Sequence, residues 1–447
     1  MEKRGYKTTS EYYKNAGIIW FILAIFISFV GSLQLQFGLF SSSEVIGYGK
    51  LTPIFLIIVI FGSILSFFLS MLYDELDKLP IDQIKPTIVG NISFYVHQLS
   101  LVFGLLTIML GRNDGRIYGE MNFITDNLFM LVFTIAVVLT LVHVKTYGKV
   151  NGIFQLIIFT LAGMMATFFL GNFGFPNSYI TIVPPTSGFQ DAISQGFYTT
   201  GVLVFFVGMP LISIFYSVIK NYNQIDDEGI NFSSFFIMIA VLVSISGGVG
   251  LGNSPYQNFW TWIGNYVYSV INLLFLGFMY YLHNLYYQTK KEHYITIPVF
   301  GIALSIFFLV NTILSLPIIY RYIQYTSIDV LILPNKVLYL LMPLYFLYTA
   351  YQKHQLKEPI HPYLSNTFLA IFIIIMLLFG LESILQSFAI YEMKDGNIVN
   401  NSWEVILSKT SFVHYVKIIL DIVYLIIAFL LVPIAFKTKE FLTEKTA

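Results

Sequence analysis

Histidine is the residue type in this chain best suited to binding iron or copper, because imidazole offers a neutral nitrogen lone pair. The seven histidines are His97, His143, His283, His293, His354, His361 and His414. His97 and His143 fall toward the same ends of two adjacent apolar segments, where two facing imidazoles could hold a b-type haem. The alternative is a hydrogen-bonded His97 inside the membrane and a His143 at its surface. Both interpretations stay open on the sequence alone.

Charged residues inside apolar segments are the second candidate for chemistry. Glu382 lies in one such segment, and Lys417 and Asp421 lie in the next. Lys417 and Asp421 are four residues apart, so they share a helix face and can pair, and Glu382 could join them at similar depth. Charges within a membrane are costly and suggest a function. The cluster is interpreted either as a proton-conducting or coupling site or, as the spacing favours, as a self-neutralising pair that fixes helix packing.

Apolar segments long enough to cross a membrane run through the whole chain. Of its 447 residues, 57% are hydrophobic and 11% are charged, which is outside the range of soluble globular proteins. A membrane-spanning helix needs about 20 apolar residues. The sequence therefore predicts an all-α polytopic membrane protein with about twelve transmembrane helices. We place them at residues 16–40, 50–73, 91–111, 125–145, 150–171, 190–219, 231–251, 260–287, 294–317, 329–352, 364–390 and 411–436.

The distribution of positive charge predicts the topology. Two thirds of the 24 Lys and Arg residues fall in the N-terminal segment, the even-numbered loops and the C-terminal segment. Positive residues mark the cytoplasmic side, so both termini are expected in the cytoplasm. The net charge is zero, which suggests membrane lipid rather than nucleic acid as a partner. The chain has no cysteine, which excludes thiolate-ligated clusters and haem attached through CxxCH.

The segment Tyr48–Tyr73 begins Tyr-Gly-Lys-Leu-Thr-Pro-Ile, continues through Val-Ile-Phe-Gly and ends on a tyrosine. This run resembles the second membrane helix of haem-copper oxidase catalytic subunits, in particular the C-family, the cbb-type cytochrome c oxidases. Weaker matches follow in the family's order at His97-Gln98-Leu99, Gly171-Asn172, Ser187–Ala192 with Gln195 and Tyr198, and Gln386-Ser387. The resemblance covers about residues 15–436. It implies one membrane domain, residues 1–447, with the subunit I bundle of a respiratory enzyme in a prokaryotic plasma membrane.

The resemblance also implies a metal centre whose ligands this chain lacks. Family members hold two haems and one copper between the helices, through six histidines on the second, sixth, seventh and tenth helices. The aligned positions here are Phe55, Thr200, Val249, Gly250, Ile332 and Pro334. None of these side chains can replace imidazole. The resemblance thus implies a degenerate active site, with neither haem nor copper in the chain.

The expected role is a structural or docking subunit of a respiratory electron-transfer complex. The resemblance is to a terminal oxidase, and the missing ligands argue against enzymatic activity without excluding it. The partner of such a subunit would be a membrane-anchored cytochrome c or another respiratory subunit. One alternative is a catalytic cytochrome c oxidase or nitric oxide reductase subunit with unusual haem ligation. Another is a membrane carrier that uses the vacated haem cavity. We expect Thr200, Val249, Gly250 and Ile332 to converge, and Phe55 with neighbouring aromatic residues to fill the haem pockets.

Overall fold

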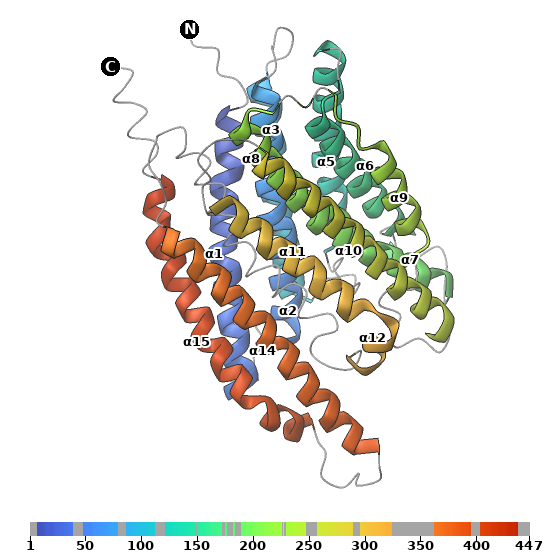
Figure 1. Cartoon of the computed structure of the whole chain (residues 1–447), viewed down its shortest axis with the longest axis vertical. Coiled ribbons are helices and arrows are strands. Elements are labelled where there is room, and N and C mark those ends of the chain that lie inside the picture. Colours follow the sequence, from blue (N-terminus) through green and yellow to red (C-terminus); the bar gives the residue numbers. More distant parts are fainter. Residues whose placement is uncertain are drawn as a thin grey trace. The chain divides into compact units, whose positions relative to one another are not determined.

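The described part of the chain consists almost entirely of helices, most of them apolar (Figure 1). The structure is a computed structural model. It describes residues 7–38, 48–78, 86–111, 121–147, 150–171, 175–176, 182–183, 189–225, 227, 229–246, 257–288, 296–323, 362–394 and 403–436.

Within these residues, ten helices are long and apolar enough to cross a membrane, which confirms an all-α polytopic membrane protein. Each of the ten overlaps one of the predicted segments. The predicted segment 231–251 contains only a shorter apolar helix, Ser233–Ser244. The segment 329–352 lies outside the described residues, so a total of twelve spans stays a prediction.

Several predicted spans are built from more than one helical segment. The helices, with π-helical segments labelled η, are α1 (Lys7–Phe37), α2 (Tyr48–Ile57), η1 (Ile58–Ile64), α3 (Leu65–Asp77), α4 (Pro86–Met109), α5 (Phe123–Tyr147), α6 (Gly152–Gly171), α7 (Phe189–Gly201), η2 (Val202–Gly208), α8 (Met209–Asn223), α9 (Ser233–Ser244), α10 (Gln257–Tyr287), α11 (Thr296–Ser315), α12 (Pro317–Ile323), α14 (Pro362–Lys394) and α15 (Trp403–Phe436). Two short strands, β1 (Phe175–Pro176) and β2 (Ile182–Val183), pair antiparallel.

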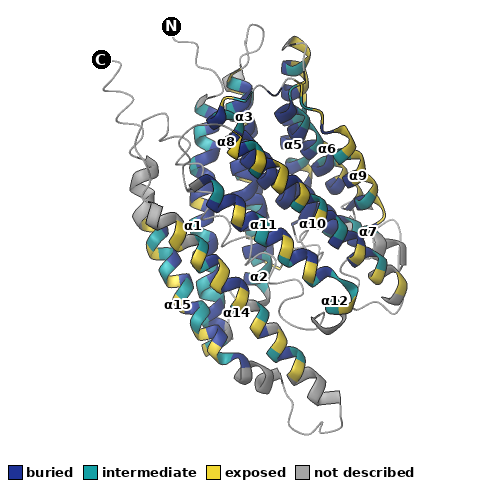
Figure 2. Cartoon of the chain, viewed as in Figure 1, coloured by how far each residue is buried: buried dark blue, intermediate teal, exposed yellow. Residues whose placement is uncertain are grey.

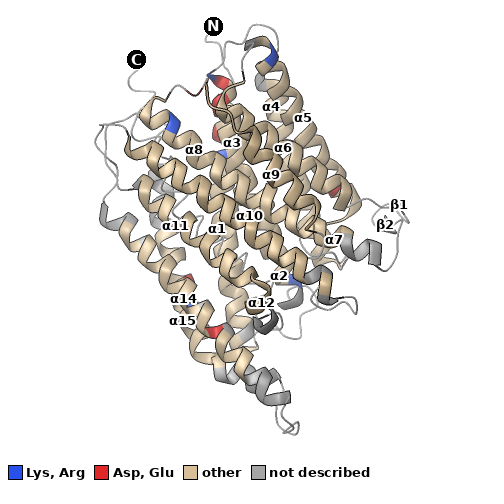
Figure 3. Ribbon diagram, turned by 45° about the vertical axis from the view of Figure 1, so that its right-hand side comes forward, with Lys and Arg blue, Asp and Glu red and all other residues tan. Residues whose placement is uncertain are grey.

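Helix α4 illustrates how the sequence selects a membrane helix. Its large exposed apolar residues recur every three or four positions, at Ile88, Ile92, Tyr95, Leu99, Val102 and Leu106. Residues at that spacing lie on one face of a helix, so the side chains of this face can contact lipid. The helix also hydrogen-bonds its own backbone polar groups, which lipid cannot do. Exposed residues also recur along α14 and α15 (Figure 2). Charged residues are sparse along the helices (Figure 3).

The chain forms two compact units. Unit 1 comprises Met1–Gly17, Leu56–His293 and Leu304–Arg321, and unit 2 comprises Ile18–Phe55, Tyr294–Ala303 and Tyr322–Ala447. In unit 1, η1 packs against η2, and α4, α5 and α6 pack in succession beside them. The spans that contain η1 and η2 are buried throughout their most apolar stretches. In unit 2, α14 packs against α15.

Close packing of α6 on α7 depends on Gly171. A side-chain carbon at this position would overlap the buried ring of Tyr198. We expect Gly171→Leu to lower the thermal unfolding temperature of the purified protein, because a well-packed interior cannot absorb the added volume without strain. Gly277→Leu is the matched control, since open space surrounds that position. Equal losses for the two variants would contradict the close contact.

Candidate functional site

Two of the six positions aligned with the family's metal ligands lie within the described residues. Phe55 is buried in α2, and its ring cannot ligate iron. Thr200 is buried in α7, where its hydroxyl donates to the carbonyl oxygen of Gly196 at 3.1 Å. Phe55 belongs to unit 2 and Thr200 to unit 1. The other four positions, Val249, Gly250, Ile332 and Pro334, lie outside the described residues, so the expected convergence stays a prediction.

Five phenylalanines fill the centre of unit 1. They are Phe61 of η1, Phe129 and Phe133 of α5, Phe168 of α6 and Phe206 of η2. All five are fully buried or nearly so, and the centroids of neighbouring rings lie 5.2 to 6.2 Å apart, the range of attractive aromatic contacts. We call this group the phenylalanine core. Phe55 is not part of this group, so the expectation that Phe55 and neighbouring aromatic residues fill haem pockets stays a prediction.

The phenylalanine core includes residues of both π-helical segments. Each segment is seven residues long and lies within a buried span, η1 directly after α2 and η2 directly after α7. Their sequences, IVIFGSI and VLVFFVG, are apolar and fully buried. π-Helical turns are rare and frequently occur at functional sites. No sequence pattern indicated them, because they arise from packing in the bundle.

His97 uses both of its ring nitrogens in hydrogen bonds. The side-chain amide of Gln98 donates to Nδ1 at 2.9 Å, so Nε2 carries the proton and donates to the carbonyl oxygen of Phe61 at 3.0 Å. The ring also lies 5.6 Å from those of Tyr13 and Phe129. His97 thus ties α4 to a π-helical carbonyl of η1. This arrangement matches the structural alternative for His97 and leaves neither nitrogen for iron.

His143 does not lie beside His97. It follows Phe129, the ring neighbour of His97, by 14 residues on α5, which is about 21 Å along the helix axis. Its Nδ1 bonds within its own helix to the carbonyl oxygen of Leu139 at 2.7 Å. An iron bound by two imidazoles needs each nitrogen at about 2 Å, as in other metal–imidazole bonds. The structure therefore does not bring His97 and His143 together as haem ligands.

A buried ionic cluster in unit 1 joins α3 to α8 and was not predicted. Glu75 of α3 is 2% exposed. Its carboxylate lies 2.8 Å from Nζ of Lys78 and 3.8 Å from Nζ of Lys220, and it accepts a hydrogen bond from the hydroxyl of Ser217 at 2.7 Å. Lys220 also lies 3.2 Å from Asp227. We call this group the Glu75–Lys220 cluster.

Asp227 extends the Glu75–Lys220 cluster to a third helix. Its second carboxylate oxygen accepts a hydrogen bond from the backbone N–H of Ile153, at the start of α6, at 3.0 Å. This contact satisfies one of the free N–H groups of the first helical turn. A sequence signal was available in Ser217, Lys220 and Asn221, which share one face of an apolar span. That spacing predicts a polar contact but does not identify Glu75 as its partner.

In unit 2, the three intramembrane charges are arranged differently from the expected pair. Asp421 is fully buried and accepts hydrogen bonds from the hydroxyls of Ser28 and Ser32 of α1, at 3.3 and 3.1 Å. Lys417 is half-buried, and no ion pair joins it to Asp421 or to another of the described residues. Asp421 thus has the interior orientation that was one of the two expected for it, and the direct Lys417–Asp421 ion pair is not among the contacts of the described residues. The four-residue spacing correctly predicts that Lys417 and Asp421 share a helix face, but it cannot predict that hydroxyl groups of α1 bind Asp421.

Glu382 pairs with a histidine that the sequence did not single out. Its Oε1 lies 3.7 Å from Nε2 of His414 on α15 and accepts a hydrogen bond from the side chain of Gln386 at 3.0 Å. The hydroxyl of Thr410 lies 3.3 Å from the same His414 nitrogen. Glu382 is 3% exposed and His414 5%. The four-residue spacing of Thr410, His414 and the nearby Lys417 could have indicated this face.

The chemistry available in the described regions is acid–base chemistry. Within those regions, no three His, Asp or Glu side chains group closely enough to hold a metal ion. The carboxylate and imidazole that do meet, Glu382 and His414, can share or pass a proton. No known family model matches the chain, and no curated protein matches it.

Proposed function

We propose that this integral membrane protein is a haem-copper oxidase subunit I-like subunit that binds no haem or copper of its own. Its role is structural: it docks or stabilises a partner in a respiratory electron-transfer complex of a prokaryotic plasma membrane, with both termini in the cytoplasm. The observation that carries the proposal is the chemistry at the ligand positions. Phe55 and Thr200 occupy two of them and are buried, and neither side chain can replace imidazole at a haem or copper.

Burial of the second and sixth predicted spans supports the same proposal. In the family these helices carry metal ligands and surround the active site. Here the corresponding spans, Lys50–Asp77 and Ser194–Asn223, are buried throughout their most apolar stretches. The side chains between η1 and η2 are phenylalanines in mutual contact. Two buried spans whose aligned positions lack haem and copper ligands fit a subunit that keeps the helix packing of the family and has lost the electron-transfer cofactors.

The partner proposed is a membrane-anchored cytochrome c or another respiratory subunit that carries the electron-transfer cofactors. The two alternatives are a catalytic subunit with unusual ligation and a carrier. His97, which would be the first candidate for unusual ligation, has both nitrogens hydrogen-bonded. A carrier needs a polar-lined cavity, whereas the centre of unit 1 is filled by the phenylalanine core. Both observations favour the docking role.

Affinity purification in a mild detergent tests this role. We expect the tagged chain to bring down a haem-containing membrane protein, and the haem absorbance to leave with that partner when a stronger detergent separates the two. A haem band that stays with the isolated chain would support the catalytic alternative. Recovery of the chain alone under every mild condition would contradict docking.

His97 offers a test by substitution. We expect His97→Phe to leave any visible absorbance unchanged and to reduce the folded yield, because the variant deprives the buried carbonyl of Phe61 of its donor. His143→Phe is the comparison variant, since Nδ1 of His143 bonds to a carbonyl oxygen of its own helix rather than to a neighbouring one. It should leave the absorbance unchanged too. Loss of a haem band in both single variants would overturn the structural role of these histidines.

A further inference from the structure

One face of α15 is polar through much of its apolar length. Thr410, His414, Lys417, Asp421 and Tyr424 follow one another at intervals of four, three, four and three residues, which places them on the same helix face. Four of them are buried and Lys417 is half-buried. The run covers 15 residues, with about 21 Å of helix axis between the first and the last, within the candidate span Thr410–Phe429. We call it the α15 polar face.

Near one end of the α15 polar face, His414 pairs with Glu382 of the neighbouring helix α14. Away from water, a carboxyl group and an imidazole can share one proton with zero net charge. The proton is either on the carboxyl group, beside a neutral imidazole, or on the imidazole, beside a carboxylate. The two forms differ by one proton transfer. The 3.7 Å between Oε1 and Nε2 exceeds the usual hydrogen-bond distance of about 2.9 Å, so a shift of roughly 1 Å would close it.

Further along the α15 polar face, Asp421 lies near the middle of the candidate span Thr410–Phe429. Asp421 lies seven residues beyond His414, about 10 Å along the helix. Hydroxyls from α1 hold its carboxylate, through Ser28 at 3.3 Å and Ser32 at 3.1 Å. Hydroxyl groups can both donate and accept. They therefore hold the carboxyl group whether or not it is protonated.

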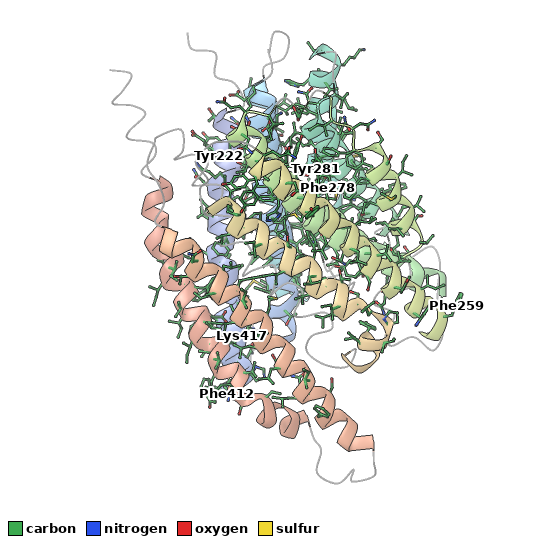
Figure 4. The ribbon with its side chains drawn as sticks, in the orientation of Figure 1. Tyr222, Phe259, Phe278, Tyr281, Phe412 and Lys417 are labelled. Atoms are coloured by element: carbon green, nitrogen blue, oxygen red, sulfur yellow. The ribbon has the colours of Figure 1, made fainter. Side chains whose placement is uncertain are left out.

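Lys417 lies between these two parts. It is three residues from His414 and four from Asp421, so it neighbours both on the helix surface. Figure 4 labels Lys417 and the exposed Phe412 on α15. The two residues are five positions apart in the sequence, or about one and a half helical turns. The flexible four-carbon stem of Lys417 lets the ammonium group move. Because no described carboxylate holds it in an ion pair, it is free to approach either end.

We propose that unit 2 contains a proton relay in which Glu382, His414, Lys417 and Asp421 pass a proton between one membrane face and the middle of the bilayer. The O–H bond of Glu382 breaks as an N–H bond forms at Nε2 of His414. Lys417 then gives a proton to Asp421 and takes one from the imidazolium, so that no net charge is created. Other polar groups that face the relay are Thr410 and the titratable Tyr424 of α15, Gln386 of α14 and Ser28 and Ser32 of α1.

The arrangement argues against a purely structural cluster. A pair that served only to neutralise charge would join Lys417 directly to Asp421, since they are one turn apart. Instead the carboxylate takes two hydroxyl partners from another helix, and the two carboxylates are held at separate levels by different groups. Ionisable residues inside a membrane span suggest a function by default, and proton relays are one of the functions they serve.

The test is chemical labelling of the full-length protein in phosphatidylethanolamine–phosphatidylglycerol vesicles. Dicyclohexylcarbodiimide reacts with protonated carboxyl groups in membranes, and peptide mass spectrometry locates the adduct. We expect an adduct at Glu382 or Asp421 that decreases as the pH rises, and none at Glu75, which is held by Lys78 and Lys220. Absence of the adduct at both carboxylates at every pH, or an adduct independent of pH, would overturn the relay.

The variant His414→Gln tests whether Glu382 shares a proton with His414. We expect His414→Gln to displace the pH dependence of labelling at Glu382, because the carboxyl group loses the base that takes its proton. His143→Gln is the matched control, since His143 is also buried in a span but lies outside the relay. The same profile in the wild type and in His414→Gln would refute proton sharing. The outcome does not depend on the docking role, because labelling needs no partner protein.

Discussion

Phe168→Ala is expected to destabilise the protein more than any other single aromatic truncation in unit 1. The ring of Phe168 lies beside five other rings, those of Phe61, Phe129, Phe133, Tyr198 and Phe206, with centroid distances of 5.3 to 6.1 Å. Truncation leaves a cavity that the surrounding helices cannot fill. Phe→Ala changes in water-soluble cores cost roughly 3–5 kcal/mol. We expect the lower end of that range, because helices in lipid gain packing contacts rather than hydrophobic burial.

The adjacent residue supplies the control for this prediction. Phe169 has the same side chain in the same helix turn but is 58% exposed, so Phe169→Ala should have a small effect. The measurement is unfolding of the purified protein by denaturant or heat in detergent. Similar losses for Phe168→Ala and Phe169→Ala would mean that the core is not packed as described.

Lys220→Met is expected to have the second large effect. It removes the cation that lies 3.2 Å from Asp227 and 3.8 Å from Glu75, two carboxylates that are 2% exposed. Leaving a buried charge without its partner costs roughly 3–5 kcal/mol. Lys78 still reaches Glu75 at 2.8 Å, so most of the loss should arise at Asp227, and α6 should loosen at its start.

Two further variants test whether the loss depends on the charge at position 220 and on the buried location of that charge. Lys220→Arg keeps the charge and should recover most of the stability, measured as the thermal unfolding temperature in detergent. Lys145→Met, at an exposed position near the end of α5, should be close to neutral. If Lys220→Arg were as unstable as Lys220→Met, the cluster would depend on the shape of the lysine side chain rather than on its charge.

The membrane-spanning helices could be predicted from the sequence because lipid imposes a simple rule. A run of about 20 apolar residues must form a helix, since every backbone polar group needs a partner within the segment. The segments 50–73 and 190–219 were found in this way. Their π-helical portions, η1 and η2, could not be found, because IVIFGSI and VLVFFVG are equally compatible with an ordinary helix.

The contacts at the candidate site were less predictable for a related reason. Spacing along one helix determines which residues share a face, as it did for Lys417 and Asp421. The partner across the interface depends on how two helices far apart in sequence are aligned. Ser28 and Ser32 lie almost 400 residues from Asp421, with sequence separations of 393 and 389. No local pattern connects them, and the same holds for Glu75 and Lys220.

Optical spectroscopy with metal analysis of the purified chain is the most direct test of the proposal that this chain binds no haem or copper. That proposal depends on residue types: no histidine stands at Phe55, Thr200 or the other aligned positions. We expect a featureless visible spectrum and iron and copper well below one atom per chain after partners are removed. A Soret band with stoichiometric iron in the isolated chain would contradict the account.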